Sequence, residues 1–130
     1  MGQQQLLLIV LGVIIVGIAV VVGINVFTAS SLQANIDGLT ADVVNLGSMA
    51  QQYHRKPTAL GGGGNSFVGW AIPSALDTTG NGTYVITGTP TATQIVITGT
   101  GNEIGANGTS GVVVTATVSP TGITTAVTNN

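Results

Sequence analysis

The feature that most constrains this chain is an apolar run from Leu6 to Ile24, nineteen residues that are all Leu, Ile, Val, Ala or Gly. About 20 helical residues, at 1.5 Å each, cross a hydrocarbon core of about 30 Å. Lipid also requires every backbone N–H and C=O to be bonded within the segment, so we expect a helix despite the many β-branched residues. Because exposing the run to water would cost on the order of tens of kcal/mol, it must lie in lipid or in protein.

Two other interpretations of the run compete with burial in protein. A cleavable signal peptide needs a basic segment before its apolar core, and residues 1–5 contain no Lys or Arg. A plain membrane anchor is the serious alternative. Gly12, Gly17 and Gly23 would let helices approach closely, but their spacing is not the small-xxx-small pattern of membrane helix dimers, so this signal is weak.

An amphipathic segment follows the apolar run without an intervening proline. Its apolar residues recur at alternating intervals of four and three, which predicts one apolar helix face. The residues on this face that we expect to pack against a sheet are Leu32, Ile36, Leu39, Val43, Leu46 and Tyr53. A short coiled coil would show the same spacing, but the chain that follows supplies a better partner. The opposite face, which includes Asn35 and Asp42, is expected to be polar.

The helix is expected to end at Pro57, which cannot continue it. His54, Arg55 and Lys56 fall in its last turn, where cations complement the helix dipole. We therefore predict one continuous helix with an apolar half, residues 1–27, and an amphipathic half, residues 28–57. A Gly-rich linker, residues 58–74, comes next. Its run Gly61–Gly64 lacks the Lys-Ser/Thr end of a phosphate-binding loop, so we predict a flexible connector.

The last part of the chain, residues 75–130, has the alternation typical of β-strands. Four strands are predicted, over about residues 83–89, 94–100, 112–118 and 123–127. They form an antiparallel meander with a Thr-rich outer face. The predicted fold class is therefore α+β, a long N-terminal helix packed on a small four-stranded antiparallel sheet. Phe67 and Trp70 are expected to close the join between helix and sheet.

The composition argues against several functions. Only 5% of the residues are charged, against about 25% in typical soluble domains. Two basic side chains cannot form a nucleic-acid surface, so no nucleic-acid partner is expected. One histidine, four scattered carboxylates and no cysteine predict no catalytic, cofactor-binding or metal-binding residues. A catalytic triad would have to use His54, beside two cations that oppose its protonation.

Surface glycans are a further expectation. The triplets at residues 81–83 and 107–109 match the Asn-x-Thr acceptor pattern for N-linked sugar. In so Thr-rich and Gly-rich a segment such matches arise by chance. O-linked sugar on the Thr-rich face is therefore favoured over N-linked sugar.

The order of these segments resembles the type IV pilins and their pseudopilin relatives. The resemblance is specific over residues 1–30 and looser from Ala50 to Pro57. It implies a membrane-stored subunit that a prepilin peptidase cuts and that then packs, helix against helix, into an extracellular filament. It also implies modification at Met1, where the family usually has a methylated Phe. Gln5 stands where the family usually has a glutamate, so its bond to a neighbour's N-terminus would be neutral.

From these features we expect a structural subunit of an extracellular helical filament, held in the inner membrane before assembly. The alternative is a single-pass membrane-anchored binding module or a minor pseudopilin of a secretion system. The expected partners are other copies of the chain and, before assembly, the membrane. The residues expected to form the assembly interface are Met1, Gln5, Leu6, Leu7, Ile9, Val10, Leu11, Val13, Ile14, Val16, Ile18, Val20, Val21, Ile24 and Phe27.

Overall fold

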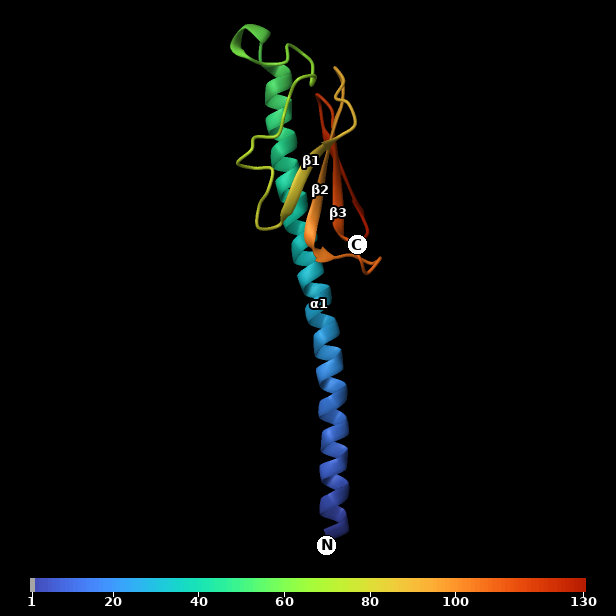
Figure 1. Cartoon of the computed structure of the whole chain (residues 1–130). Coiled ribbons are helices and arrows are strands. Elements are labelled where there is room, and N and C mark those ends of the chain that lie inside the picture. The colour runs from blue at the N-terminus through green and yellow to red at the C-terminus, as the bar shows by residue number, and fades with distance from the viewer. Residues whose placement is uncertain (1) are drawn as a thin grey trace. The chain divides into compact units, whose positions relative to one another are not determined.

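The computed structural model describes residues 2–130. Helix α1 (Gly2–Arg55) and the short 3₁₀ turn η1 (Thr58–Leu60) precede four strands (Figure 1), which are β1 (Gly82–Thr87), β2 (Ile95–Ile104), β3 (Gly111–Val118) and β4 (Ile123–Thr128). The α+β fold predicted from the sequence is confirmed. By its internal contacts the chain divides into two units, Met1–Ser31 and Leu32–Asn130, which are described in turn.

Over residues 2–31 the first unit is helical. Its large apolar side chains, from Leu6 to Phe27, are each between 53% and 73% exposed. This part of α1 is long and apolar enough to cross a membrane. Within residues 2–31 these side chains have no tertiary partner, so the helix leaves them to be covered by its surroundings.

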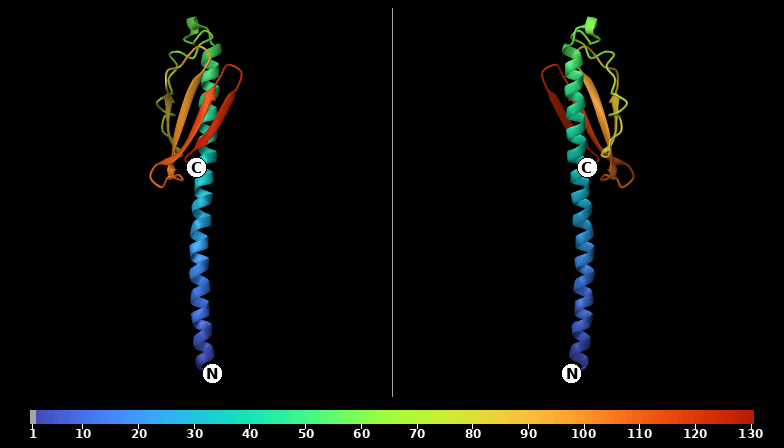
Figure 2. Two further views of the ribbon diagram at one scale, coloured as in Figure 1. Left: turned by 90° about the vertical axis from the view of Figure 1, so that its right-hand side faces the viewer. Right: turned by 90° about the vertical axis from the view of Figure 1, so that its left-hand side faces the viewer.

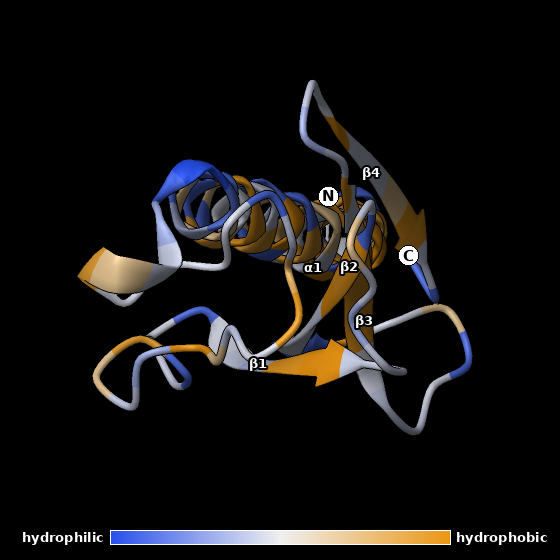
Figure 3. Ribbon diagram, turned by 90° about the horizontal axis from the view of Figure 1, so that it is seen from above, coloured by the Kyte–Doolittle hydropathy of each residue, from blue (hydrophilic) through white to orange (hydrophobic). Residues whose placement is uncertain are grey.

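In the second unit, residues 32–55 of α1 pack against the sheet. The strands are antiparallel and lie in the order β1-β2-β3-β4. Seen from above, the sheet curves along one side of the helix, with β1 and β4 at its edges (Figure 3). Alternate residues of the two central strands face α1 and are buried, namely Ile95, Ile97, Val112, Val114, Ala116 and Val118.

The helix stripe forms the other side of this core. Ile36, Leu39, Val43 and Leu46 are buried, while Leu32 and Tyr53 are partly buried at the ends of the stripe. Gly47 lies where the sheet comes closest. A Cβ atom there would stand 2.9 Å from side-chain carbons of both Val118 and Ile123. The glycine therefore costs helix propensity but lets β3 and β4 approach the helix.

The strand boundaries differ slightly from the prediction. β1 ends at Thr87, before Gly88 with its positive φ of 74°, and β2 extends to Ile104. The register of β2 with β3 shifts between Thr100 and Ile104, which allows the longer strand. β4 pairs with β3, and beyond the partly buried Ile123 its residues are exposed. The sheet therefore extends past the helix at this edge.

The Gly61–Gly64 run is a hydrogen-bonded helix cap rather than the flexible connector expected from its composition. The Gly63 and Gly64 amides donate to the carbonyls of Tyr53 and Lys56 at 2.8 and 3.0 Å. A Cβ atom at Gly63 would stand 1.9 Å from the Ser66 carbonyl oxygen. The glycines are therefore needed for close approach of the backbone, which satisfies carbonyls that a helix end leaves unpaired.

The connection between η1 and β1 then runs back along the helix (Figure 2). Three contacts follow it in sequence. The Tyr53 hydroxyl donates to the Val68 carbonyl at 3.0 Å, Thr79 bonds Asp42, and the Asn35 amide donates to the Asn81 carbonyl at 2.7 Å. The connection is thus held to α1 near its start, at Val68, and at its end, at Thr79 and Asn81.

Candidate functional site

The largest unexplained surface is the apolar helix surface, residues 6–27 of α1. The predicted interface residues from Leu6 to Phe27 lie on it and are exposed, and Gln5 is exposed beside it. Met1, predicted as an interface residue and a modification site, lies outside the described residues. Since a helix turns about 100° per residue, the apolar side chains point to every side.

Three glycines lie among the large side chains of this surface. Apart from the adjoining residues and the nearby helix backbone, no heavy atom lies within 4 Å of the Cβ position at Gly12, Gly17 or Gly23. Gly12 and Gly23 are eleven positions apart and so lie within about 20° of each other around the helix, whereas Gly17 faces about 140° away. The surface therefore offers low points for close helix approach on two different sides.

A polar cluster joins α1 to the sheet in the second unit. We define the Asp42 cluster as Asp42, Thr79, Asn81 and Tyr84. The Asp42 carboxylate accepts hydrogen bonds from Thr79 Oγ1 at 3.0 Å, from Asn81 Nδ2 at 3.0 Å and from the Tyr84 hydroxyl. All three donors bond the same oxygen, Oδ2, so the cluster holds the connection and β1 on the helix.

The ionisation of the cluster follows from this geometry. Partial burial acts to raise the pKa of Asp42, but the hydrogen bonds from Asn81, Tyr84 and Thr79 outweigh it and hold the pKa below 3.8. Burial, together with the bond to Asp42, raises the pKa of Tyr84 to about 12. A charged carboxylate beside a neutral phenol is therefore the stable state over the ordinary pH range.

Asn35 extends the same side of α1 toward its N-terminal end. Its side chain is buried, and its Oδ1 accepts the Glu103 amide N–H at 3.3 Å. The returning connection and the end of β2 cover the polar side of α1 that carries Asn35 and Asp42. The sequence signal was their spacing of seven, which puts both on one helix face, with Gly38 between them leaving room for Asn81.

His54 is a core residue in this structure. Its ring lies 4.6 Å from that of Phe67, and its Nε2 is 3.1 Å from the Ala92 carbonyl oxygen. Its Nδ1 is buried and has no hydrogen-bond partner within residues 2–130. Over the same residues, no group of three or more His, Asp or Glu side chains gathers in a way that could hold a metal ion.

The two N-linked acceptor triplets lie in different settings. The Asn81 amide nitrogen is engaged by Asp42, whereas Asn107 lies in an exposed loop, where its Oδ1 accepts the amides of Thr109 and Ser110 at 3.0 Å. On the outer face of the sheet the threonine hydroxyls of Thr87 and Thr98 lie 2.6 Å apart. Sugar on the chain stays a prediction from the sequence.

Comparison of the chain with protein-family models, with curated proteins and with solved structures gave no match. The resemblance to type IV pilins accordingly stays a prediction from the sequence.

Proposed function

We propose that this chain is a structural subunit that polymerises through α1 into an extracellular helical filament of the type IV pilus kind. The observation that carries the proposal is the apolar helix surface, whose side chains are exposed all around the helix. A role in assembly rather than catalysis also agrees with the second unit, whose clustered polar groups join its own elements together.

The mechanism that we propose is an exchange of lipid contacts for protein contacts. Before assembly the apolar helix surface lies in the membrane. In the filament it packs against the same surface of several neighbours, where Gly12 and Gly23 on one side and Gly17 on another allow close approach. Gln3, Gln4 and Gln5 hydrogen-bond to one another or to a neighbour's terminus. Head-to-tail contacts of this kind propagate into open filaments.

The second candidate is a single-pass membrane-anchored binding module or a minor pseudopilin. The length and hydropathy of α1 favour it equally, since a lone anchor needs the same run. The two proposals differ in what touches the glycines. A lone anchor exposes them to lipid tails, which tolerate bulk, whereas a bundle of helices packs tightly around them.

Gly17→Leu separates the candidates. Leucine raises hydropathy and so favours membrane insertion, and the space around Gly17 within the chain is open. We expect Gly17→Leu to keep its membrane pool and to lose filaments, while the matched control Val16→Leu keeps both. Filaments of Gly17→Leu at the wild-type yield would contradict the proposed packing. The measurement is the amount of the chain in the sheared filament fraction relative to the membrane fraction.

A further inference from the structure

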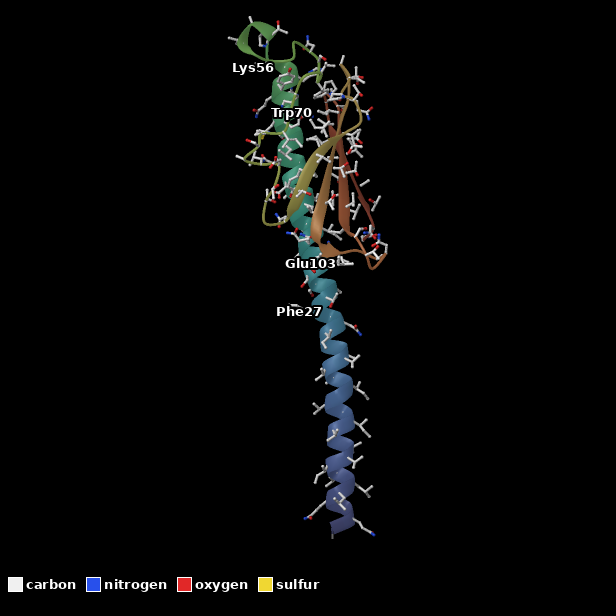
Figure 4. The ribbon with its side chains drawn as sticks, viewed as in Figure 1. Phe27, Lys56, Trp70 and Glu103 are labelled. Carbon is white, nitrogen blue, oxygen red and sulfur yellow. The ribbon has the colours of Figure 1, made fainter. Side chains whose placement is uncertain are left out.

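The few charges of the second unit are segregated along α1. Both basic side chains, Arg55 and Lys56, lie at the C-terminal end of the helix, which we call the basic end. Asp37 and Glu103 lie at about the same height near the other end of this unit, on different sides of α1, because Asn35, two positions before Asp37, accepts the backbone N–H of Glu103. We call this pair the acidic end. Figure 4 shows Lys56 and Glu103 at opposite ends of the sheet.

These four charges have no ionic partner within the described chain. All four side chains are exposed, and no ion pair within 4.0 Å involves any of them across residues 2–130. Arg55 donates to the Pro120 carbonyl at 3.3 Å, and Asp37 accepts from Gln33 at 3.0 Å. By contrast, Asp42 accepts three hydrogen bonds at Oδ2 inside its own cluster. The charges at the two ends are therefore available to another molecule.

The distance between the two ends is fixed by the helix. Asp37 and Arg55 are eighteen positions apart, which is about five full turns and about 27 Å along the axis. The acidic end and the basic end of one chain therefore cannot meet. Two copies placed side by side in the same direction and at the same height would set like charges level with each other.

We infer that the acidic end of one copy binds the basic end of a second copy displaced by about 27 Å along α1. The inference rests on the proposed function, because subunits drawn from one membrane share one direction. For each pair of copies, the displacement replaces two like-charge contacts with one opposite-charge contact, and so selects the axial register between neighbours. The contact is heterologous, since each copy uses a different end toward each neighbour, and it repeats along a filament.

Charge reversal tests this contact in the full chain. Single exposed ion pairs are weak, but this contact recurs at every subunit. We expect Arg55→Glu with Lys56→Glu, and separately Asp37→Lys with Glu103→Lys, to lower filament yield on the order of tenfold. Joining all four substitutions in one chain should restore the yield to within about twofold. The control is Asp77→Lys, which reverses an exposed acid that belongs to neither end and should leave the yield unchanged.

Crosslinking provides a second test that does not depend on yield. The chain has no cysteine, so Arg55→Cys with Glu103→Cys in one chain introduces the only thiols. Because the two ends are too far apart for a link within one chain, a short thiol crosslinker should produce a ladder of oligomers from native filaments. A wild-type yield for both reversal variants, or crosslinked products that stop at dimers, would overturn the inference. If either result is obtained while the wild type still forms filaments, the inference fails but the proposed function stands. A wild type that forms no filaments would contradict both the proposed function and the inference.

Discussion

The hydroxyl of Tyr84 on β1 donates a hydrogen bond to the carboxylate of Asp42 on α1, joining strand to helix across 42 positions of sequence. The Tyr84 ring at the same time fills the core, where it is 2% exposed and covers Gly99. One side chain thus contributes both apolar burial and the polar bond that fixes β1 on the helix.

Tyr84→Phe separates these two contributions, because phenylalanine keeps the ring and removes the hydroxyl. A hydrogen bond to a charged acceptor is worth about 1.5–3 kcal/mol, so we expect a loss of that size in the free energy of unfolding. Tyr53→Phe is the control, since the Tyr53 hydroxyl donates to the neutral Val68 carbonyl and should cost about 0.5–1.5 kcal/mol. Urea unfolding of the full chains in detergent micelles measures both. Equal losses for the two variants would contradict the role of the Asp42 bond.

The lowered pKa of Asp42 predicts an acid limb of stability. The folded state binds fewer protons at Asp42 than the unfolded chain does, so stability is fully present above the ordinary pKa of 3.8 and falls as pH drops through the lowered value. Asp42→Asn should reduce this loss of stability at low pH. The control Asp37→Asn, at an exposed carboxylate, should leave the loss unchanged. Unfolding free energies between about pH 2 and 6 test this, and a wild type whose stability does not fall below pH 4 would refute it.

Tyr84 predicts an alkaline limb of the opposite sign. Its raised pKa makes its contribution complete below the ordinary value of 10.0 and lost as pH rises through about 12. Tyr84→Phe should therefore flatten the stability profile in this window, because phenylalanine does not titrate. Thermal unfolding from pH 9 to about 12 is the measurement, and an unchanged slope in Tyr84→Phe would count against the assignment.

The Gly-rich cap predicts a sharp difference between two neighbouring glycines. Gly63→Ala would push a methyl group against the Ser66 carbonyl oxygen, so we expect a loss of at least about 2 kcal/mol. At Gly61 the Cβ position is open, and only its φ of 84° opposes alanine, which costs about 1 kcal/mol. Unfolding of both variants by urea tests the cap. A Gly63→Ala chain as stable as Gly61→Ala would restore the interpretation of this run as a flexible connector.

A charge in the apolar helix surface should separate assembly from folding. We expect Leu11→Asp or Val16→Asp to abolish filaments while the second unit stays folded, because both residues lie in the first unit. Val85→Asp, on the exposed side of β1, is the matched control and should retain filaments. Filaments that survive in Leu11→Asp would show that this surface is not buried against neighbours.

Periodicity carried most of the fold prediction. The spacing of the apolar stripe placed Leu39, Val43 and Leu46 on one helix face, and strict alternation puts Val112 and Val114 on the same face of their strand. Both patterns arise from burial on a single side, which leaves a record in every residue of the element.

The polar contacts left a weaker record, the spacing of seven that puts Asn35 and Asp42 on one helix face without saying what covers them. Asn35 and Asp42 are covered by segments that return after 46 and 37 positions of sequence, and no local pattern states where a loop returns. Composition misled at Gly61–Gly64, since glycine serves both flexible linkers and tight backbone contacts. The apolar run shows that these side chains must be buried, but its sequence does not show whether lipid or protein buries them.

Imaging of the native assembly tests the central claim most directly. Filaments sheared from cells that produce the chain would be examined by electron cryomicroscopy and their main protein identified by mass spectrometry. We predict filaments made chiefly of this chain, with residues 6–27 packed against the same residues of several neighbours. Native material that consists of single chains dispersed in bilayers, with the chain missing from every filament fraction, would contradict the account.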